Sequence, residues 1–528
     1  MPHYNFAKRL LIVGSSLLMV SLFVTTEEIS ASDRRDGKPN VVIFLVDDLG
    51  AMDIGASNPN TFYETPNIDR LAAEGTRFTQ GYAASCVCSP TRFSIMTGKY
   101  PVRNGCTDWF GGERVERFRP APAHDRLDHD EFTIAEAFRE AGYKTAHIGK
   151  WHLGPTPEFW AENHGFDINV GGFRNGTPPS WFSPYNNPRL EDGPDGEFLT
   201  ERLAREAVNF IKQAKDSPFF IHYSFYQVHT PLRAPETVVQ KYRDKAARLG
   251  LPAASEELFD SEDQHFLTDD ARLVRTRQTH PVYAAMVECM DTAVGRIVDA
   301  LREEGLLENT VICFLSDNGG LSTSEGLPTC NLPLRGGKGW QYEGGHRIPF
   351  IIRVPGVNPQ VSHCPVITTD IYPTMLELAG LPLQPEQHLD GVSLAPIFKG
   401  EEAVKRDGLY WHYPHYGNQG GFPGGAVRVG DWKMIRNYEN GRIYLYNLKD
   451  DPSEQNDLAE SEPQRARDLA AKHDRWLQSV GAKFLREKEG HQPWSPDYTA
   501  TRYKLDFASF AVNSSFFTAK YARDAKDK

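Results

Sequence analysis

Four short, mostly apolar runs constrain the fold of this chain more than any other feature. Each has the length of a strand and the composition expected of one that is buried on both faces of a sheet. Segments with helical periodicity, among them 198–211 and 283–301, separate the runs. The runs are residues 40–46, 143–148, 219–225 and 310–315. Strands that alternate with helices predict an α/β fold, in which a largely parallel sheet is sandwiched by helices.

Polar or ionisable residues follow each of the four predicted strands. They are Asp47 and Asp48, Lys150 and His152, His229, and Asp317 and Asn318. The carboxyl ends of parallel strands meet at one edge of a sheet, where α/β proteins bind their ligands. The pattern therefore predicts one shared site. The alternative for the two adjacent aspartates is a solvated turn, because adjacent carboxylates are costly to bury without a compensating cation.

The stretch Cys88-Ser89-Pro90-Thr91-Arg92 predicts an anion site at the start of a helix. Pro90 suits a first helical turn, and Arg92 lies four residues after Cys88, on the same helical face. A helix N-terminus attracts anions through its free N–H groups. One alternative is a buried cysteine before an ordinary helix. Another is a metal or redox pair with Cys86, which is disfavoured because no second Cys/His pair at zinc spacing accompanies it.

A glycine-rich segment at 335–347 precedes another predicted strand at 350–352. Glycines permit close approach of the backbone, so Lys338 could reach back into the predicted site. The alternative is an exposed lysine on a flexible loop. His147 and His222 lie within predicted strands, and we interpret both as structural.

The length and composition predict a large domain followed by a smaller one. A chain of 528 residues exceeds one compact core, and a charged stretch at 401–407 has the character of a boundary. Four short antiparallel strands, with an Asn440-Gly441 hairpin turn, and a helix at 463–477 follow it. We predict the main domain at 38–400, a C-terminal α+β subdomain built on a short antiparallel sheet at 401–482, and a tail at 483–528. The net charge of −12 argues against nucleic-acid binding.

The N-terminus has the pattern of an export signal. Lys8 and Arg9 precede an apolar run at 10–24, and small residues follow at 30–32. We predict a signal peptide at 1–32 and an exported protein, periplasmic or secreted, with no stable membrane span. The alternative is an uncleaved anchor, although the run is short for a membrane span. Seven cysteines leave at least one outside any set of intramolecular disulfides, and the pairing of the other six cannot be predicted: Cys86, Cys106, Cys289, Cys313, Cys330 and Cys364.

The motifs together resemble those of the sulfatase family, within the alkaline-phosphatase-like superfamily. The resemblance covers residues from about 39 to about 477, and its motifs occur in the expected order. They are Val46-Asp47-Asp48, Cys88-Ser89-Pro90-Thr91-Arg92 with Thr97-Gly98, Gly149-Lys150-Trp151-His152, His229-Thr230-Pro231, Ser316-Asp317-Asn318-Gly319, and Lys338 with Glu343-Gly344-Gly345. Two small departures are Thr91, where the family usually has serine, and Lys99, where arginine is common.

This resemblance implies that a maturation enzyme converts Cys88 to formylglycine (3-oxoalanine), recognising Cys88, Pro90 and Arg92. One hydroxyl of the hydrated aldehyde would attack sulfur, and the other would expel the bound sulfate. The resemblance also implies one Ca²⁺ ion, held by the modified Cys88 side chain and four further residues: Asp47, Asp48, Asp317 and Asn318. Oxygen donors of this kind suit a hard cation.

The resemblance assigns further roles at the same site. Arg92, Lys150 and Lys338 would bind the sulfate and neutralise its developing charge. Asp317 would be the base that deprotonates the nucleophile. His229, with Lys338, would protonate the leaving alkoxide and contact the substrate, and His152 would assist the release of sulfate.

The resulting hypothesis is an exported, calcium-dependent, arylsulfatase-like hydrolase of sulfate monoesters, with a sulfated carbohydrate as the favoured substrate. One alternative is a phosphonate monoester or phosphodiester hydrolase of the same superfamily. A more remote one is a non-catalytic protein that binds sulfated glycans. We expect Trp109, Phe110, Arg174, Trp181 and the stretch 411–416 to line the mouth of the pocket, where aromatic rings suit stacking on a sugar.

Overall fold

The computed structural model describes residues 37–251, 258–262 and 271–496. The predicted signal peptide and the last 32 residues of the predicted tail (497–528) lie outside these ranges. The N-terminal prediction of export therefore stays a prediction.

An eight-stranded mixed sheet forms the centre of the molecule, and the predicted α/β fold is confirmed. Strands β9, β1, β6, β4 and β5 are parallel to one another, whereas β11 runs antiparallel to β9 and β2. The order across the sheet is β12 (Gln360–Ser362), β2 (Thr76–Phe78), β11 (Phe350–Arg353), β9 (Thr310–Ser316), β1 (Asn40–Val46), β6 (Phe219–Ser224), β4 (Lys144–Gly149) and β5 (Ile168–Val170).

The register of the four central strands brings their carboxyl ends to one edge. Ser224 of β6 pairs with Leu45 of β1 and with Gly149 of β4, and Ser316 of β9 pairs with Val46 of β1. The residues that follow these strands therefore start from neighbouring points in space. This register positions the site.

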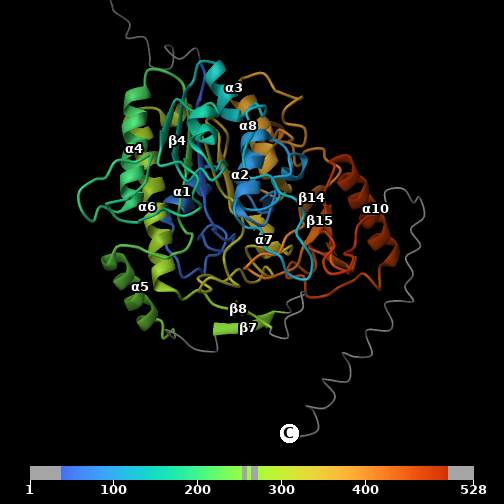
Figure 1. The fold of residues 1–528 in the computed structure, drawn as a ribbon. Coiled ribbons are helices and arrows are strands. Elements are labelled where there is room, and N and C mark those ends of the chain that lie inside the picture. Colours follow the sequence, from blue (N-terminus) through green and yellow to red (C-terminus); the bar gives the residue numbers. More distant parts are fainter. Residues whose placement is uncertain (1–36, 252–257, 263–270, 497–528) are drawn as a thin grey trace, which may run out of the picture.

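Helices cover both faces of the sheet (Figure 1). Helices α4 and α6 lie on one side of β4 in that view, and α2, α3 and α8 lie on the other. On the first side are α1 (Pro66–Glu74), α4 (Leu199–Ala214), α5 (Glu236–Arg248) and α6 (Pro281–Glu303), and on the second α2 (Cys88–Thr97), α3 (Ile134–Glu140) and α8 (Ile371–Leu378). The predicted capping box is present at α3, where Thr133 and Glu136 cap each other's backbone N–H groups.

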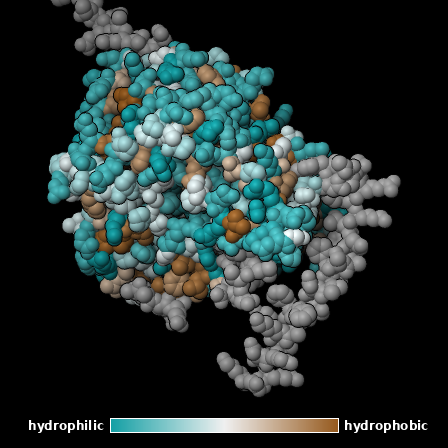
Figure 2. Space-filling view, in the orientation of Figure 1, coloured by the Kyte–Doolittle hydropathy of each residue, from teal (hydrophilic) through white to brown (hydrophobic). Residues whose placement is uncertain are grey.

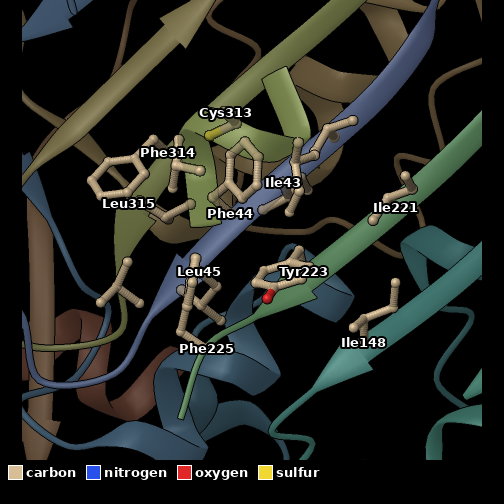
Figure 3. Close-up of a cluster of buried hydrophobic side chains, with 14 of the residues drawn as sticks. Ile43, Phe44, Leu45, Ile148, Ile221, Tyr223, Phe225, Cys313, Phe314 and Leu315 are labelled. Atoms are coloured by element: carbon tan, nitrogen blue, oxygen red, sulfur yellow. The ribbon is translucent and has the colours of Figure 1, made fainter. Parts of the chain in front are cut away.

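The core between sheet and helices is aromatic as well as aliphatic. Phe44 of β1 packs edge-on against Tyr223 of β6, with ring centroids 5.9 Å apart, and Phe225 lies beside both (Figure 3). All seven residues of β1 and of β9 are buried, which explains their continuous apolar runs.

A smaller antiparallel sheet forms the C-terminal subdomain, as predicted. Helix α10 packs against three of its strands. The elements are β14 (Leu409–Tyr413), β15 (Gly424–Val429), β16 (Trp432–Asn437), β17 (Ile443–Asn447) and α10 (Pro463–Ser479). Small elements of the remaining chain are β3 (Gly81–Tyr82), β10 (Arg347–Ile348) and β13 (Val366–Ile367) in one sheet, β7 (Phe259–Glu262) and β8 (Arg272–Arg275) in another, α7 (Glu343–His346) and α9 (Ala395–Phe398).

A buried ionic cluster, here called the joint cluster, connects the subdomain to the main domain. It consists of Glu343 of α7, Lys433 of β16 and Glu454. The Lys433 ammonium lies 3.0 Å from a carboxylate oxygen of each glutamate. The Glu343 backbone N–H donates to Glu454 at 2.6 Å, and Tyr82 donates its hydroxyl to Glu343 at 2.7 Å. The cluster thereby anchors the start of α7, within the glycine-rich segment at 335–347.

The surface agrees with the composition. Figure 2 shows a face made mostly of hydrophilic residues, with hydrophobic residues in small separate patches. Among the described residues, no helix combines the length and the apolar character needed to cross a membrane. All seven cysteines are free thiols, and six of them are buried.

Candidate active site

All ten predicted site residues lie together at the carboxyl edge of the sheet. They are Asp47, Asp48, Cys88, Arg92, Lys150, His152, His229, Asp317, Asn318 and Lys338. Nine of them have less than 5% of their surface exposed, and His229 is half-buried. Buried charge on this scale requires compensation, and the ion pairs of the site supply it.

Asp47 and Asp48 each pair with one lysine. The Lys150 ammonium donates to Asp47 at 2.7 Å, and the Lys338 ammonium donates to Asp48 at 2.8 Å. Burial would raise the pKa of Asp48, but Lys338, His229 and Lys150 together hold that pKa below its usual value. Lys338 is thus a buried partner of the site and not an exposed loop residue, and the aspartates are not a solvated turn.

Arg92 connects the helix to three strand ends. Its guanidinium donates to Asp317 at 2.7 and 3.0 Å, to the Lys150 carbonyl at 3.1 Å and to the Ser224 hydroxyl at 2.5 Å. The Nη2 atom of Arg92 also lies 3.6 Å from Oδ1 of Asp47. The planar, multi-donor guanidinium satisfies the acceptors on Asp317, Lys150 and Ser224 at once, which a lysine cannot do.

Helix α2 begins at Cys88, as the proline in its first turn predicts. Val87 before it is extended, and Gly98 ends the helix in the left-handed conformation with φ of 67°. The Cys88 sulfur lies 3.4 Å from Nδ1 of His152. Burial raises the pKa of the Cys88 thiol. An unmodified Cys88 is therefore a neutral thiol near pH 7, which is a poor nucleophile.

The two histidines differ in how they are held. His229 bonds through Nδ1 to the Thr230 carbonyl at 2.6 Å, so this nitrogen carries the proton and Nε2 faces Asp48 at 3.8 Å. Burial and Lys338 lower the pKa of His229 to about 4. Burial, followed by Lys150 and Arg92, holds the pKa of His152 well below its usual value. Both imidazoles are neutral in this structure at pH 7.

Two residues that follow the strand ends take a left-handed backbone conformation, which is rare in residues other than glycine. Asp48 has φ of 62° and His152 has φ of 56°, both in the left-handed region. Such residues cost about 1–3 kcal/mol each and concentrate at functional sites. Gly149 has φ of 102°, and a Cβ there would lie 1.9 Å from the Ser224 carbonyl, so only glycine fits between β4 and β6.

The donor set fits a divalent cation. The Asp47 Oδ1 and Asn318 Oδ1 atoms are buried and have no hydrogen-bond partner in the part of the chain that the structure describes. Asp47, Asp48 and His229 each offer one ligand atom within 4.8 Å of the others. His229 was not predicted as a ligand, whereas Asp317 was; both Asp317 oxygens accept hydrogen bonds here, from Arg92 and from the Asp48 N–H. Carboxylate and amide oxygens suit a hard cation.

Comparisons with known proteins identify the family. The family model described as "Sulfatase" matches residues 39–381, and the one described as "N-sulphoglucosamine sulphohydrolase, C-terminal" matches 337–480. The chain belongs to the sulfatase family. It is a sulfuric ester hydrolase, and the resemblance seen in its motifs is confirmed.

Relatives of this sulfatase span most of its length. A sulfatase of Formosa agariphila is 31% identical, over 88% of this chain and 93% of the relative. The N-acetylgalactosamine-6-sulfatase of Mus musculus is 31% identical, over 71% and 68%. The crystal structure of Ps i-CgsB in complex with k-i-k-neocarrahexaose superposes with a TM-score of 0.68 at 29% identity, covering 83% of this chain and 92% of that one.

The buried cluster of this sulfatase opens into a cavity of about 780 Å³, here called the main cavity. Cys88, His152, His229 and Lys338 form its floor. Trp109, Phe110 and Arg174 line it, as predicted. The prediction is wrong for two tryptophans, which are core residues bonded to backbone carbonyls: Trp181 donates to Pro231, and Trp411 to Ala83. Of the stretch 411–416, no residue lines the main cavity.

Two polar contributors to the site were not predicted. Ser224 holds Arg92, and its position as the last residue of β6 is the signal that could have identified it. Glu325 lines the main cavity and accepts hydrogen bonds from Thr230 and from the amides of Asn418 and Gln419. It lies in a segment without periodicity or motif, so no local pattern marks it.

Proposed function

We propose that this sulfatase hydrolyses a sulfate monoester of a carbohydrate, using formylglycine at position 88 and one Ca²⁺ ion. The observation that carries the proposal is the floor of the main cavity. There the Cys88 side chain, two neutral histidines and a buried ammonium face one space, above a cluster of three aspartates. The export pattern at 1–32 supports a periplasmic or secreted location.

Formylglycine supplies a hydrated aldehyde whose two hydroxyls serve as nucleophile and as the group that expels sulfate. The surroundings of Cys88 support this modification, since the buried thiol is protonated and therefore weak as a nucleophile itself. His152, with Nδ1 3.4 Å from the sulfur, is within reach of an oxygen at that position and can take its proton.

The candidate ligands for Ca²⁺ are Asp47, Asp48, Asp317 and Asn318, together with the modified side chain at 88. When bound, the ion would supply a positive charge that stabilises anionic oxygen. Two orphaned oxygens, on Asp47 and Asn318, support a cation between these side chains.

The basic side chains are arranged to hold the sulfate group. Arg92, Lys150 and Lys338 balance the three aspartates in this structure. A divalent cation would make the pocket positive, which explains how an acidic protein binds an anionic ester. Of the three, Lys338 lines the main cavity and is the one that an entering ester meets directly.

His229 is placed to protonate the leaving alkoxide. Its Nδ1 is occupied by the Thr230 carbonyl, so Nε2 is the nitrogen that can carry a transferable proton into the cavity. With a pKa of about 4 it is neutral in this structure at pH 7. The negative charge of a bound sulfate ester would favour its protonation, and the neighbouring Lys338 is the second possible donor.

Three features support a carbohydrate. The main cavity combines the Trp109 and Phe110 rings with the polar side chains of Arg174 and Glu325, a mixture that suits sugar faces and hydroxyls. The mouse relative is named for an N-acetylgalactosamine sulfate, and the solved relative holds a neocarrahexaose.

The test is a screen of purified protein, matured by co-expression with a formylglycine-generating enzyme. The substrates are defined sulfated monosaccharides, 4-nitrophenyl sulfate and an aryl phosphonate ester. We expect turnover of the sulfates and of at least one sulfated sugar. Faster turnover of the phosphonate by orders of magnitude would favour a phosphonate monoester hydrolase. Binding of sulfated sugars without any turnover would favour the non-catalytic alternative.

A further inference from the structure

A second cavity lies behind one wall of the main cavity. It has a volume of about 490 Å³ and is called the side cavity here. Trp109, Phe110, Gly111 and Asp125 line both cavities, so these residues form a shared wall. A ligand that extends beyond the main cavity past this wall would enter the side cavity.

The shared wall is anchored from both sides. The Phe110 N–H donates to the Ser89 hydroxyl of α2 at 3.3 Å, and the Phe110 ring packs edge-on against His152. On the other side, Asp108 accepts from the Trp109 N–H at 2.9 Å and from the Tyr413 hydroxyl at 3.1 Å. The wall is therefore a formed part of the site and is tied to the residues around Cys88.

The side cavity contains a buried acceptor without a donor. Asp108 is 3% exposed, and its Oδ2 atom has no hydrogen-bond partner among the described residues. The nearest basic nitrogen is Nδ1 of His415, at 3.7 Å, beyond hydrogen-bond distance. An unsatisfied buried carboxyl oxygen is costly, and a hydroxyl group entering the cavity, which can both donate and accept, would satisfy it.

The charge of the side cavity differs from that of the main cavity. Glu113 and Asp125 line it together with Asp108, whose pKa burial raises to about 7, and Arg486 is the one arginine or lysine among its described lining residues. Burial lowers the pKa of His415 to about 3, so this histidine adds no positive charge near pH 7. A second sulfate would be repelled, whereas an uncharged, hydroxyl-rich group would not.

We propose that the side cavity binds the glycosyl unit next to the sulfated one, and that this neighbouring unit carries no sulfate. Trp109 lies between the two units and offers a ring face for stacking. Asp108 Oδ2 forms a hydrogen bond with a hydroxyl of the neighbouring unit. The inference rests on the proposed function, because it takes a sulfated carbohydrate as the ligand of the main cavity. It makes the substrate an oligosaccharide or polysaccharide rather than a free sulfated monosaccharide.

The first experiment compares substrate lengths in two variants. Ala123 is exposed and lines only the side cavity, so Ala123→Trp fills that space, and Ala123→Ser is the matched control. The substrates are 4-nitrophenyl sulfate, the best sulfated monosaccharide of the screen, and the same unit extended by one or two unsulfated units. In the wild type, extension is expected to raise kcat/KM by about 10-fold. Ala123→Trp should remove this gain and change turnover of the two small substrates less than about 2-fold.

The second experiment tests whether the side cavity disfavours a negatively charged neighbouring unit. A second sulfate on the neighbouring unit should lower kcat/KM in the wild type. Glu113→Lys should recover part of the lost kcat/KM, because it replaces a negative charge of the side cavity with a positive one. The Glu113 side chain is 73% exposed and lines only the side cavity. An extended substrate that is no better than the monosaccharide, or equal losses on all substrates in Ala123→Trp, would overturn the inference while leaving the proposed function intact. Absence of turnover of any sulfated sugar would overturn both.

Discussion

This sulfatase has two clusters of buried charged residues that resemble each other in composition but differ in role. The joint cluster has two carboxylates around one lysine, and the active-site cluster has three carboxylates around three basic groups. None of the joint residues lines either cavity, although Glu454 also takes the left-handed conformation, with φ of 52°, and its Oε1 atom has no hydrogen-bond partner among the described residues. The active-site cluster opens into the main cavity, and its Asp47 and Asn318 oxygens without a hydrogen-bond partner among the described residues belong to the candidate cation ligands.

The difference indicates which buried charged residues take part in catalysis. A buried charge by itself shows only that other groups compensate the cost of removing it from water. Function is indicated where the buried charged side chains also face a cavity that a ligand can enter, because unpartnered oxygens and left-handed residues occur in both clusters. Changes in the two clusters should therefore have opposite signatures, one in turnover and the other in stability.

The largest effect is expected at Cys88. Cys88→Ala removes the residue that becomes the nucleophile, and turnover should fall by on the order of 10⁴-fold or more. The midpoint of thermal unfolding should change little, because alanine is a small apolar replacement for a buried cysteine. Initial rates on 4-nitrophenyl sulfate and calorimetry measure the two quantities. Residual turnover within about 10-fold of wild type would contradict the role.

The next largest effect is expected at Asp317. Asp317→Ala should lower turnover by about 10³-fold and also reduce bound calcium, measured by mass spectrometry of the metal. Because the change leaves Arg92 without its main partner, Asp317→Asn is the control that keeps an oxygen and the shape. Unchanged calcium content in both variants would refute the ligand role.

A substitution in the joint cluster should lower the stability of the folded protein. Lys433→Met leaves Glu343 and Glu454 buried without their cation, so the free energy of unfolding should fall by about 3–5 kcal/mol. Turnover per folded molecule should stay close to wild type, since no joint residue reaches the substrate. Urea denaturation and rates at low temperature test the pair of expectations. A loss of turnover with unchanged stability would reverse the comparison.

A smaller and more selective effect is expected at His229. His229→Ala should slow hydrolysis of a carbohydrate sulfate by about 10²-fold, because an alkoxide needs a proton to leave. The activated 4-nitrophenolate leaves without that help, so the loss on 4-nitrophenyl sulfate should be under about 10-fold. Equal losses on the two substrates would count against general-acid catalysis by His229.

The smallest effect is a pH dependence in the joint cluster. Burial, opposed by Lys433, raises the pKa of Glu454 to about 7 from an ordinary value of 4.5. The folded state therefore holds this proton more tightly. The stabilisation, of about 1–3 kcal/mol, is full below pH 4.5 and is lost as the pH rises towards 7. Glu454→Gln should flatten this part of the stability curve, and an unchanged curve would contradict the shift.

Much of the fold was predictable because the four central strands are buried on both faces and read as apolar runs. The short strands β2, β5 and β12 were not, since each has only three residues and too few positions for a periodic signal. The ten site residues were predictable because strand ends converge and their motifs are specific. Glu325 and the side cavity depend on loops that meet only in the folded chain. Trp181 and Trp411 were misplaced because sequence does not tell a ring in the core from one at a cavity mouth.

The most direct test of the account is the chemical state of residue 88. Mass spectrometry of the peptide that spans Cys88, from protein matured with a formylglycine-generating enzyme, should show the side chain CH₂–SH replaced by an aldehyde. The modified fraction should scale with turnover across preparations that differ in maturation. Full turnover by protein that keeps an unmodified Cys88 thiol would contradict the account.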